Sequence, residues 1–319
     1  MLNSNDSQIK ASVIVPIYNG ENDLPDLIRC LQLQTYPRNQ IEYILVDNNS
    51  NDRTAKILKA SVIEGAKEGL LFKALQKSQI QSSYAARNQG IKAARGEILA
   101  FTDADCRPFP DWIEKLIQPF TNPDIGIVVG GLIALPGNSL LEKYAERTKM
   151  MSPHFLLEHP FGAFGQTANL AICKKAFKQI GLFRPYLTTG GDADICWRIQ
   201  RETGFKLTFS GEAIIRHRHR STLPELISQW QRYGRSHLYL HELHGVDLME
   251  DLTFKTSLYC LSRWLFKDLP RDSFQLIQGK VPVIDLIKTP IELIISQARN
   301  SGQREAILPE KARQIEWLD

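Results

Sequence analysis

Residues Glu97–Asp105 read EILAFTDAD, an apolar run that ends in two aspartates separated by a single residue. Side chains two positions apart on an extended strand point to the same side, so Asp103 and Asp105 are expected to present their carboxylates together. Acidic pairs also occur in ordinary turns, but two carboxylates held together at a strand end repel each other unless a positive charge lies between them. The pattern therefore favours a site for Mn2+ or Mg2+, hard cations that typically bridge carboxylates to substrate phosphates.

The residues before this run predict the fold. Short β-branched runs occupy Ala11–Ile17, Ile41–Asp47 and, more weakly, Leu70–Leu75, and stretches with apolar residues at three- and four-residue spacing separate them. Strands that alternate with helices predict right-handed crossovers and a Rossmann-like, mostly parallel mixed sheet flanked by helices. In such α/β sheets ligands bind outside the carboxyl ends of the strands.

Polar residues follow the first two of these strands. The first runs through Pro16 into Tyr18 and Glu21, and the second ends at Asp47. Arg87 lies in the helix-like stretch before the aspartate pair, where a guanidinium suits a phosphate or a carboxylate, although a lone helix arginine is also an ordinary solvated residue. We expect these side chains to surround a ligand.

A glycine pair introduces a further acidic cluster. Gly190 and Gly191 lead into a helix whose first turn holds Asp192, with Asp194 two positions later. A carboxylate there is stabilised by the helix dipole, so one interpretation is an N-terminal cap. The other is a general base, because an ionised aspartate at a loop–helix junction can meet an incoming hydroxyl.

The segment Arg216–Arg220 alternates arginine with histidine, so that on a strand His217 and His219 share one face. His217 is a candidate to complete the metal site of the two aspartates. Arg232 and Arg235, further along, are candidates to neutralise a leaving diphosphate. The same arginines also fit an ordinary basic surface, or one that faces anionic lipid or nucleic acid.

Composition excludes several classes of protein. The 39 Lys and Arg against 35 Asp and Glu give a net charge of +4, too weak for a dedicated nucleic-acid binder. The five cysteines form no C-x-x-C pair, which argues against a disulfide framework or a zinc cluster and favours a reducing compartment. We find no apolar signal core at the N-terminus and no run of about 20 apolar residues, so a transmembrane helix is not expected.

The character of the chain changes after Gly245. Residues 246–319 show no strand alternation and predict helices broken at Pro270, Pro282 and Pro290. We therefore expect a catalytic domain over residues 1–245 and a helical extension over 246–319. The apolar stretches of the extension fit packing on the main domain, contact with another subunit, or an amphipathic face that lies on a membrane.

In their order and spacing, these motifs resemble the family 2 glycosyltransferases of the GT-A fold, from Ser12 to about Gly245. The fingerprints are SVIVPIYNGE, ILVDNNSNDRT, AARNQGIKAARGEILAFTDADC, TANLAICKKAFKQIGLF, GGDADICWRI and QRYGRS. The resemblance implies an enzyme that moves a sugar, expected to be a hexose, from a nucleotide-diphosphate sugar to an acceptor hydroxyl. It also implies inversion at the anomeric carbon and dependence on Mn2+ or Mg2+.

The resemblance assigns roles to the residues already singled out. Residues implied to bind the nucleotide sugar are Pro16, Tyr18, Glu21, Asp47, Arg87, Asp103, Gln231, Arg232 and Arg235. Asp103 and Asp105 match the metal-binding D-x-D, which His217 would complete. Asp192 matches the motif that supplies the catalytic base. Because Gly191 replaces the usual glutamate of that motif, Asp194 is a second candidate for the base.

The acceptor and the cellular setting are more open. Ser236 replaces the tryptophan that lines the acceptor channel of polymerising members, so a non-processive enzyme is expected. The expected acceptor is a lipid, a lipid-linked molecule or a saccharide, with cytoplasmic location, peripheral at the inner face of the plasma membrane. The alternative is a catalytically degenerate protein of the same fold that binds a sugar nucleotide or serves as a membrane scaffold. A sugar nucleotidyltransferase is disfavoured, since no glycine-rich phosphate loop with a lysine follows the first strand.

Overall fold

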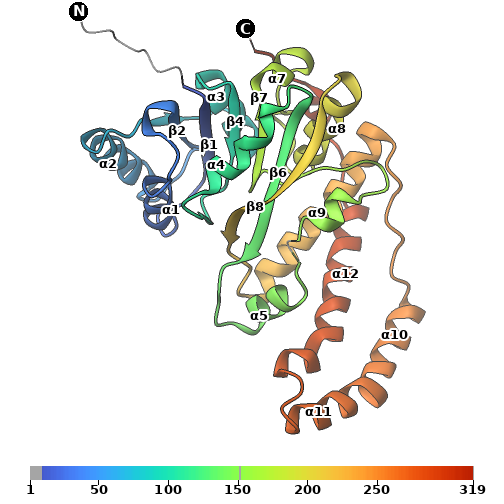
Figure 1. The fold of residues 1–319 in the computed structure, drawn as a ribbon. Coiled ribbons are helices and arrows are strands. Elements are labelled where there is room, and N and C mark those ends of the chain that lie inside the picture. Colours follow the sequence, from blue (N-terminus) through green and yellow to red (C-terminus); the bar gives the residue numbers. More distant parts are fainter. Residues whose placement is uncertain (1–8, 151, 319) are drawn as a thin grey trace, which may run out of the picture. The chain divides into compact units, whose positions relative to one another are not determined.

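The computed structural model describes residues 9–150 and 152–318. Its contacts divide the chain into two compact units, each described separately here (Figure 1). The sheet unit comprises residues 9–133, 152–217 and 309–318, and the helical unit comprises residues 134–150 and 218–308. The chain thus crosses between the units four times. This division by contacts does not test the predicted domain boundary at Gly245, which stays a prediction.

The described part of the sheet unit holds an eight-stranded sheet in the order β3-β2-β1-β4-β7-β6-β8-β5. Its strands are β1 (Ala11–Ile17), β2 (Ile41–Asp47), β3 (Phe72–Gln76), β4 (Ile98–Phe101), β5 (Cys106–Pro108), β6 (Ile125–Ala134), β7 (Leu170–Cys173) and β8 (Lys206–His217). Its helices are α1 (Leu24–Gln32), α2 (Thr54–Lys67), α3 (Ser83–Ala93), α4 (Trp112–Ile117), α6 (His154–Leu157), α7 (Lys174–Ile180) and α8 (Gly191–Glu202), with short 3-10 turns η1 (Arg38–Gln40), η2 (Gln118–Thr121) and η5 (Glu310–Arg313).

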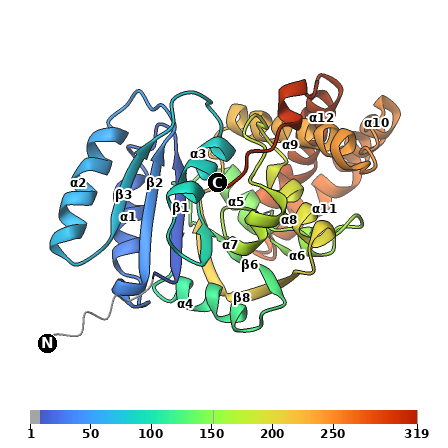
Figure 2. The same cartoon turned by 90° about the horizontal axis from the view of Figure 1, so that it is seen from above.

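The N-terminal half of the sheet is the parallel, Rossmann-like part. Strand β1 pairs in parallel with β2 and β4, and β2 with β3, which Figure 2 shows side by side in the order β3, β2, β1. Every residue of β1 and β2 is buried, as expected for parallel strands covered on both faces. The other half is antiparallel, with β7 pairing with β4 and β6, and β5 with β8. The predicted mixed α/β sheet is therefore confirmed.

Strands β8 and β5 form one edge of the sheet. Residues 206–217 form the single long strand β8. The three-residue strand β5, which follows the D-x-D pair directly, was not expected. Its pairing with β8 sets Cys106 opposite His217. Gly131 allows β8 to pack closely against β6, since a Cβ at this position would lie 2.9 Å from the carbonyl oxygen of Gly211.

The helical unit is built from α5 (Leu140–Arg147), α9 (Leu223–His244), α10 (Phe254–Arg263), α11 (Leu269–Ile277) and α12 (Lys288–Arg304), with a π-helical segment η3 (Trp264–Asp268) and a 3-10 turn η4 (Val283–Ile287). Its core is a cluster of buried residues: Tyr144, Leu226, Ile284, Ile291 and Ile295. Helices α9 and α12 pack with their backbones in contact, because Gly234 and Gly302 have no side chains to separate them. A Cβ on Gly234 would collide with the Arg299 carbonyl, and a Cβ on Gly302 would collide with the Gln231 carbonyl.

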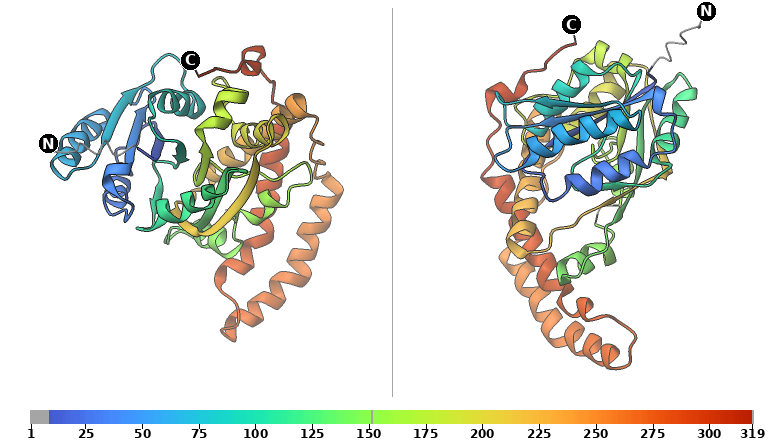
Figure 3. Two further views of the ribbon diagram at one scale, coloured as in Figure 1. Left: turned by 45° about the horizontal axis from the view of Figure 1, so that its top comes forward. Right: turned by 90° about the vertical axis from the view of Figure 1, so that its left-hand side faces the viewer.

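The expected helix break at Pro270 is wrong. Helix α10 continues through η3 into α11, and Figure 3 shows this as one unbroken coil. Proline lacks the N–H that would bond to the carbonyl four residues earlier, and its ring crowds that carbonyl. The widened π-helical turn directly before Pro270 accommodates both effects. Pro290 likewise lies inside the first turn of α12. Among the described helices, none is both long and apolar enough to span a bilayer.

Candidate active site

Asp103 lies just after β4 and forms an ion pair with Arg87 of α3, at 2.6 Å between Arg87 Nη2 and Asp103 Oδ1. Arg87 is buried, and its Nε has no hydrogen-bond partner among the described residues. A buried guanidinium with an unmet donor is uncommon and indicates a group suited to a further anionic partner. The structure thus joins two residues that the sequence assigned to the nucleotide sugar.

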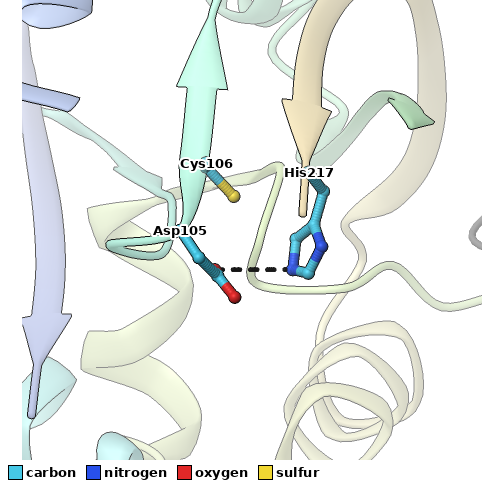
Figure 4. Close-up of side chains that lie close together, drawn as sticks. All are labelled: Asp105, Cys106 and His217. Carbon is cyan, nitrogen blue, oxygen red and sulfur yellow. Dashed lines mark ion pairs between the residues drawn. The ribbon is translucent and has the colours of Figure 1, made fainter. Parts of the chain in front are cut away.

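Asp105 faces His217 from the neighbouring strand. The distance from Asp105 Oδ1 to His217 Nε2 is 3.6 Å (Figure 4), and Cys106 completes a group whose ligand-type atoms lie within 4.8 Å of one another. The pairing of β5 with β8 creates this juxtaposition by setting Cys106 opposite His217.

The donor atoms of this cluster fit a hard divalent cation in part. A gap of 3.6 Å is too long for a hydrogen bond, yet it is within the reach of two ligands that each bind a cation at about 2.1 Å. The Nδ1 atom of His217 is buried without a hydrogen-bond partner among the described residues. Because buried polar atoms normally have a partner, the contacts of this ring within the protein do not account for its buried position. Burial raises the pKa of the Cys106 thiol, whose Sγ lies 3.8 Å from the Ala168 carbonyl oxygen. Cys106 is therefore a packed thiol, and Asp105 and His217 are the ligand candidates.

Asp192 begins the first turn of α8, and Thr167 orients its carboxylate. The Thr167 hydroxyl donates to Oδ1 at 2.9 Å and the Thr167 backbone N–H donates to Oδ2 at 3.3 Å. Desolvation raises the pKa of Asp192 above its usual value, although the positive charge of Arg87 opposes this, and the negative charge of Asp103 adds to it. Asp192 is thus close enough to the Arg87–Asp103 pair to interact with both charges.

Asp194, the second candidate for the base, lies in a different environment. It is fully buried, and its two oxygens accept from Arg184 Nε at 3.0 Å and Arg198 Nε at 3.1 Å. Arg198 also donates to the carbonyls of Ile180 and Leu182. These bonds give Asp194 the features of a structural anchor, which favours Asp192 for chemistry.

The predicted residues of the first two strand ends lie on and after β1 and β2. Asp47 is buried and accepts the backbone N–H of Ser50 at 2.9 Å. Glu21 holds Arg53 at 3.0 Å, and the Arg53 contacts lower the pKa of the Glu21 carboxylate. Tyr18 is 53% exposed, which leaves its ring available for contact with a ligand. Pro16 lies within β1.

The remaining nucleotide-site candidates belong to the helical unit. Gln231, Arg232 and Arg235 lie on α9, and the Arg232 guanidinium stacks 5.8 Å from the centre of the Tyr233 ring. Their part in the site stays a prediction.

Three residues around the site were not predicted from the sequence. Thr167 and Cys106 were quoted only as parts of motifs, TANLAIC and TDADC, and neither was named as a site residue. Thr167 lies in the turn before β7, where no hydrophobic periodicity marks it. Tyr84 was not named as a site residue either, although its hydroxyl accepts the backbone N–H of Gly191 at 3.0 Å and so fixes the start of α8.

A cavity of about 670 Å³ lies within the helical unit. Its charged lining consists of ion pairs, Arg147 with Asp285, Arg271 with Asp272, and Lys288 with Glu292. Since each cation already has an acidic partner, the cavity offers no unbalanced charge to a phosphate, and none of the predicted site residues lines it.

The mixed sheet, with acidic residues after its strands, has the GT-A fold of glycosyltransferases. The chain belongs to glycosyl transferase family 2, whose family model matches residues 12–181. Glycosyltransferase AglE from Haloferax volcanii is 30% identical over 258 residues, which cover 80% of this chain and 81% of that protein. The predicted family is therefore confirmed.

Two further similarities are more limited. The undecaprenyl-phosphate 4-deoxy-4-formamido-L-arabinose transferase of Pseudomonas aeruginosa is 32% identical over 112 residues, 34% of this chain and 31% of that protein. The mannosyltransferase PcManGT from Pyrobaculum calidifontis, solved with GDP-Man and Mn2+, superposes with a TM-score of 0.62 at 16% identity, over 93% of this chain and 88% of that one. At this identity the likeness establishes the fold alone.

Proposed function

We propose that this protein is an inverting, metal-dependent glycosyltransferase that moves a hexosyl group from a nucleotide-diphosphate sugar to an acceptor hydroxyl. The observation that carries the proposal is the environment of Asp192: a carboxylate with a raised pKa that interacts with both members of the Arg87–Asp103 pair. A base, an anion-binding arginine and a D-x-D acid in one electrostatic neighbourhood are the groups that this transfer requires.

The donor is proposed to bind along the carboxyl ends of β1, β2 and β4. Pro16, Tyr18, Glu21 and Asp47 are assigned to the nucleoside. Arg87 and Asp103 are assigned to the diphosphate of the donor. The support is that Arg87 has a buried, unsatisfied Nε, which an additional anionic oxygen would satisfy. Gln231, Arg232 and Arg235 are assigned to the leaving diphosphate on the family resemblance.

A divalent cation is proposed as the cofactor. Asp105 and His217 would hold it, together with Asp103, whose Oδ1 is engaged by Arg87, so that Oδ2 is the oxygen assigned to the metal. When bound, Mn2+ or Mg2+ would offset the charge that develops on the leaving diphosphate. The relative solved with GDP-Man and Mn2+ supports this assignment.

Asp192 is proposed as the general base. Its carboxylate would take the proton from the acceptor hydroxyl as that oxygen attacks C1 of the sugar, and the bond from C1 to the diphosphate oxygen breaks. The sugar passes through an oxocarbenium-like state, and attack from the face opposite the leaving group inverts the anomeric carbon. Thr167 would hold the carboxylate in position through its two hydrogen bonds.

The acceptor is proposed to be a lipid or a lipid-linked molecule, with a saccharide as the alternative, and the transfer to be non-processive. The partial similarity to an undecaprenyl-phosphate sugar transferase supports a lipid-linked acceptor. We propose cytoplasmic location, peripheral at the inner face of the plasma membrane, in the synthesis of a cell-envelope polysaccharide or glycolipid. The five free cysteines fit a reducing compartment.

The test is Asp192→Asn. The donor is first chosen as the nucleotide sugar that raises the melting temperature most in a screen with MnCl2, and turnover is measured as hydrolysis of that donor. Loss of a general base predicts a fall of about 10²- to 10⁴-fold in kcat, with donor affinity by calorimetry unchanged. Wild-type turnover should also fall as the pH drops through the raised pKa of Asp192.

The matched control is Asp124→Asn, an exposed aspartate paired with Lys206, which should keep full turnover. Near-normal turnover of Asp192→Asn would show that Asp192 is not the base. A wild-type chain that binds donors but hydrolyses none would favour the alternative, a catalytically degenerate protein that binds sugar nucleotides.

A further inference from the structure

The continuous helix formed by α10, η3 and α11 carries a row of large apolar side chains that face solvent. Its most exposed members are Phe254 (84%), Phe266 (79%) and Ile277 (84%), and it continues through Leu258, Tyr259, Leu265 and Phe274. Side chains of this size with so much of their surface exposed protrude from the helix and do not line a groove. We call these seven residues the apolar face.

The π-helical segment brings the two halves of the apolar face together. Each residue of an α-helix turns by about 100°, so an unbroken α-helix would place Phe274 about 160° and Ile277 about 100° away from Leu258. The wider turn of η3 acts like one inserted residue. It rotates the following helix back by about 100°, and the apolar side chains of α10 and α11 then share one side.

The opposite side of the same helix is tied to the helical unit. The indole N–H of Trp264 donates to the Leu286 carbonyl at 2.8 Å. Asp268 forms ion pairs within the same helix, with Arg263 at 3.4 Å and Arg271 at 3.5 Å. The Trp264 bond joins the helix to η4 and favours the orientation in which the apolar face is exposed.

Basic residues lie on and beside the apolar face. Lys255, Arg263, Lys267 and Arg271 are exposed. By helical rotation Arg263, Lys267 and Arg271 fall along one edge of the face, and Lys255 falls among its apolar side chains. Asp268 and Asp272 are only partly exposed and pair with Arg263 and Arg271, so the excess positive charge comes from the two lysines. The outward surface is thus apolar with a net positive charge, the pattern of a helix that lies in a membrane interface.

We propose that α10, η3 and α11 form a membrane-interface helix that inserts its apolar face into the headgroup region of an anionic bilayer. The lysines favour a lipid partner over a protein, because lysine is depleted at protein–protein interfaces, whereas juxtamembrane lysine and arginine attract anionic lipid. The inference deepens the proposed lipid acceptor but does not rest on the chemistry, since membrane contact is measured with no sugar nucleotide present.

The test is flotation of the full-length chain with vesicles. Two compositions are used, phosphatidylcholine alone and phosphatidylcholine with a fifth of phosphatidylglycerol. Wild type should float with the anionic vesicles, and F266E/I277E should reduce the bound fraction by about tenfold or more, because two anchoring side chains become charged. Lys255→Glu with Lys267→Glu should weaken binding at low salt and show less effect at high salt.

Matched controls separate a loss of membrane binding from a loss of folding. Ile63→Glu changes another exposed apolar residue, on α2 (60% exposed), and Lys59→Glu changes an exposed lysine of the same helix. Both variants should float as wild type does. Circular dichroism and the melting temperature check that each variant is folded. The proposal is overturned if F266E/I277E floats as well as wild type. It is also overturned if wild type stays with the unbound fraction but forms dimers that F266E/I277E abolishes, since the face would then be a protein interface.

Discussion

At the scale of single residues, Asp192 and Asp194 share one helix but have opposite surroundings. Asp194 is fully buried, and each of its oxygens is paired with an arginine. Desolvation raises the pKa of Asp192, and the nearby cation Arg87, which opposes the rise, is already paired with Asp103. A carboxylate with a raised pKa is a stronger base than an unperturbed one, whereas both oxygens of Asp194 are already engaged by guanidinium groups.

The raised pKa of Asp192 affects activity and stability with opposite signs. The folded chain binds a proton at Asp192 at a higher pH than the unfolded chain does. Between the two pKa values the folded state therefore holds more protons, and this contribution to the free energy of unfolding falls as the pH rises. With Asp192 as the proposed base, we expect activity to rise over the same range, because a base must be ionised to take a proton. The desolvated position would then lower stability at the pH where the proposed base acts.

Asp194→Asn separates a structural role from a catalytic one. The change leaves the buried Arg198 and the partly buried Arg184 without their carboxylate, so we expect a loss of about 3–5 kcal/mol in the free energy of unfolding, measured by urea denaturation. Asp192→Asn should show no such loss, because an amide can donate to the Thr167 hydroxyl and accept its backbone N–H. An Asp194→Asn variant that is as stable as wild type but inactive would instead make Asp194 the base.

The sequence predicted the residue types of the site better than their pairings. The D-x-D pair and Arg87 could be found because strand ends and charge carry a local signal. The ion pair between Arg87 and Asp103, and the contact of Thr167 with Asp192, join residues 16 and 25 positions apart. Such contacts depend on how β4, β7 and α8 pack, which a single sequence does not specify.

At the scale of elements, the sequence predicted the long buried strands well. It predicted helix breaks and very short strands poorly. The buried strands β1 and β2 match the expected ranges residue for residue. The break expected at Pro270 is absent, because a π-helical turn compensates for the missing N–H. Strand β5 has only three residues, too few for an alternation signal, yet it brings Asp105 to His217.

Helices α9 and α12 provide an element-scale prediction. Gly302→Val places a side chain against the backbone of Gln231, so we expect the free energy of unfolding to fall by about 2–3 kcal/mol through overpacking. Gly204→Ala is the matched control, since a Cβ there meets nothing within 4 Å and should change stability little. Urea denaturation measures both variants. Equal stability of Gly302→Val and wild type would mean that the close packing of α9 on α12 does not occur in solution.

At the scale of the whole molecule, the net charge of +4 conceals local organisation. In the sheet unit, Asp103 and Asp105 follow β4, and Asp192 lies in the first turn of α8. Basic residues lie on and beside the apolar face of α10 and α11 in the helical unit. Average composition argues against a dedicated nucleic-acid binder, but only the topology reveals which charges are neighbours. The division into two units, with four crossings of the chain, also has no local sequence signal.

Binding of a nucleotide with a cation should stabilise the whole chain, because a ligand that binds only the folded state raises its free energy of unfolding. For wild type we expect MnCl2 to strengthen the binding of GDP or UDP by about tenfold or more, and to raise the melting temperature beyond the effect of nucleotide alone. His217→Gln should abolish the gain from MnCl2 while leaving the manganese-free affinity intact, since it removes a proposed ligand and spares the nucleotide contacts. His154→Gln, at an exposed histidine of α6, should retain the full gain. Equal nucleotide affinity of wild type with and without MnCl2 would refute the metal site, and it would leave the assignment of Asp192 as the base to be decided by its own variant.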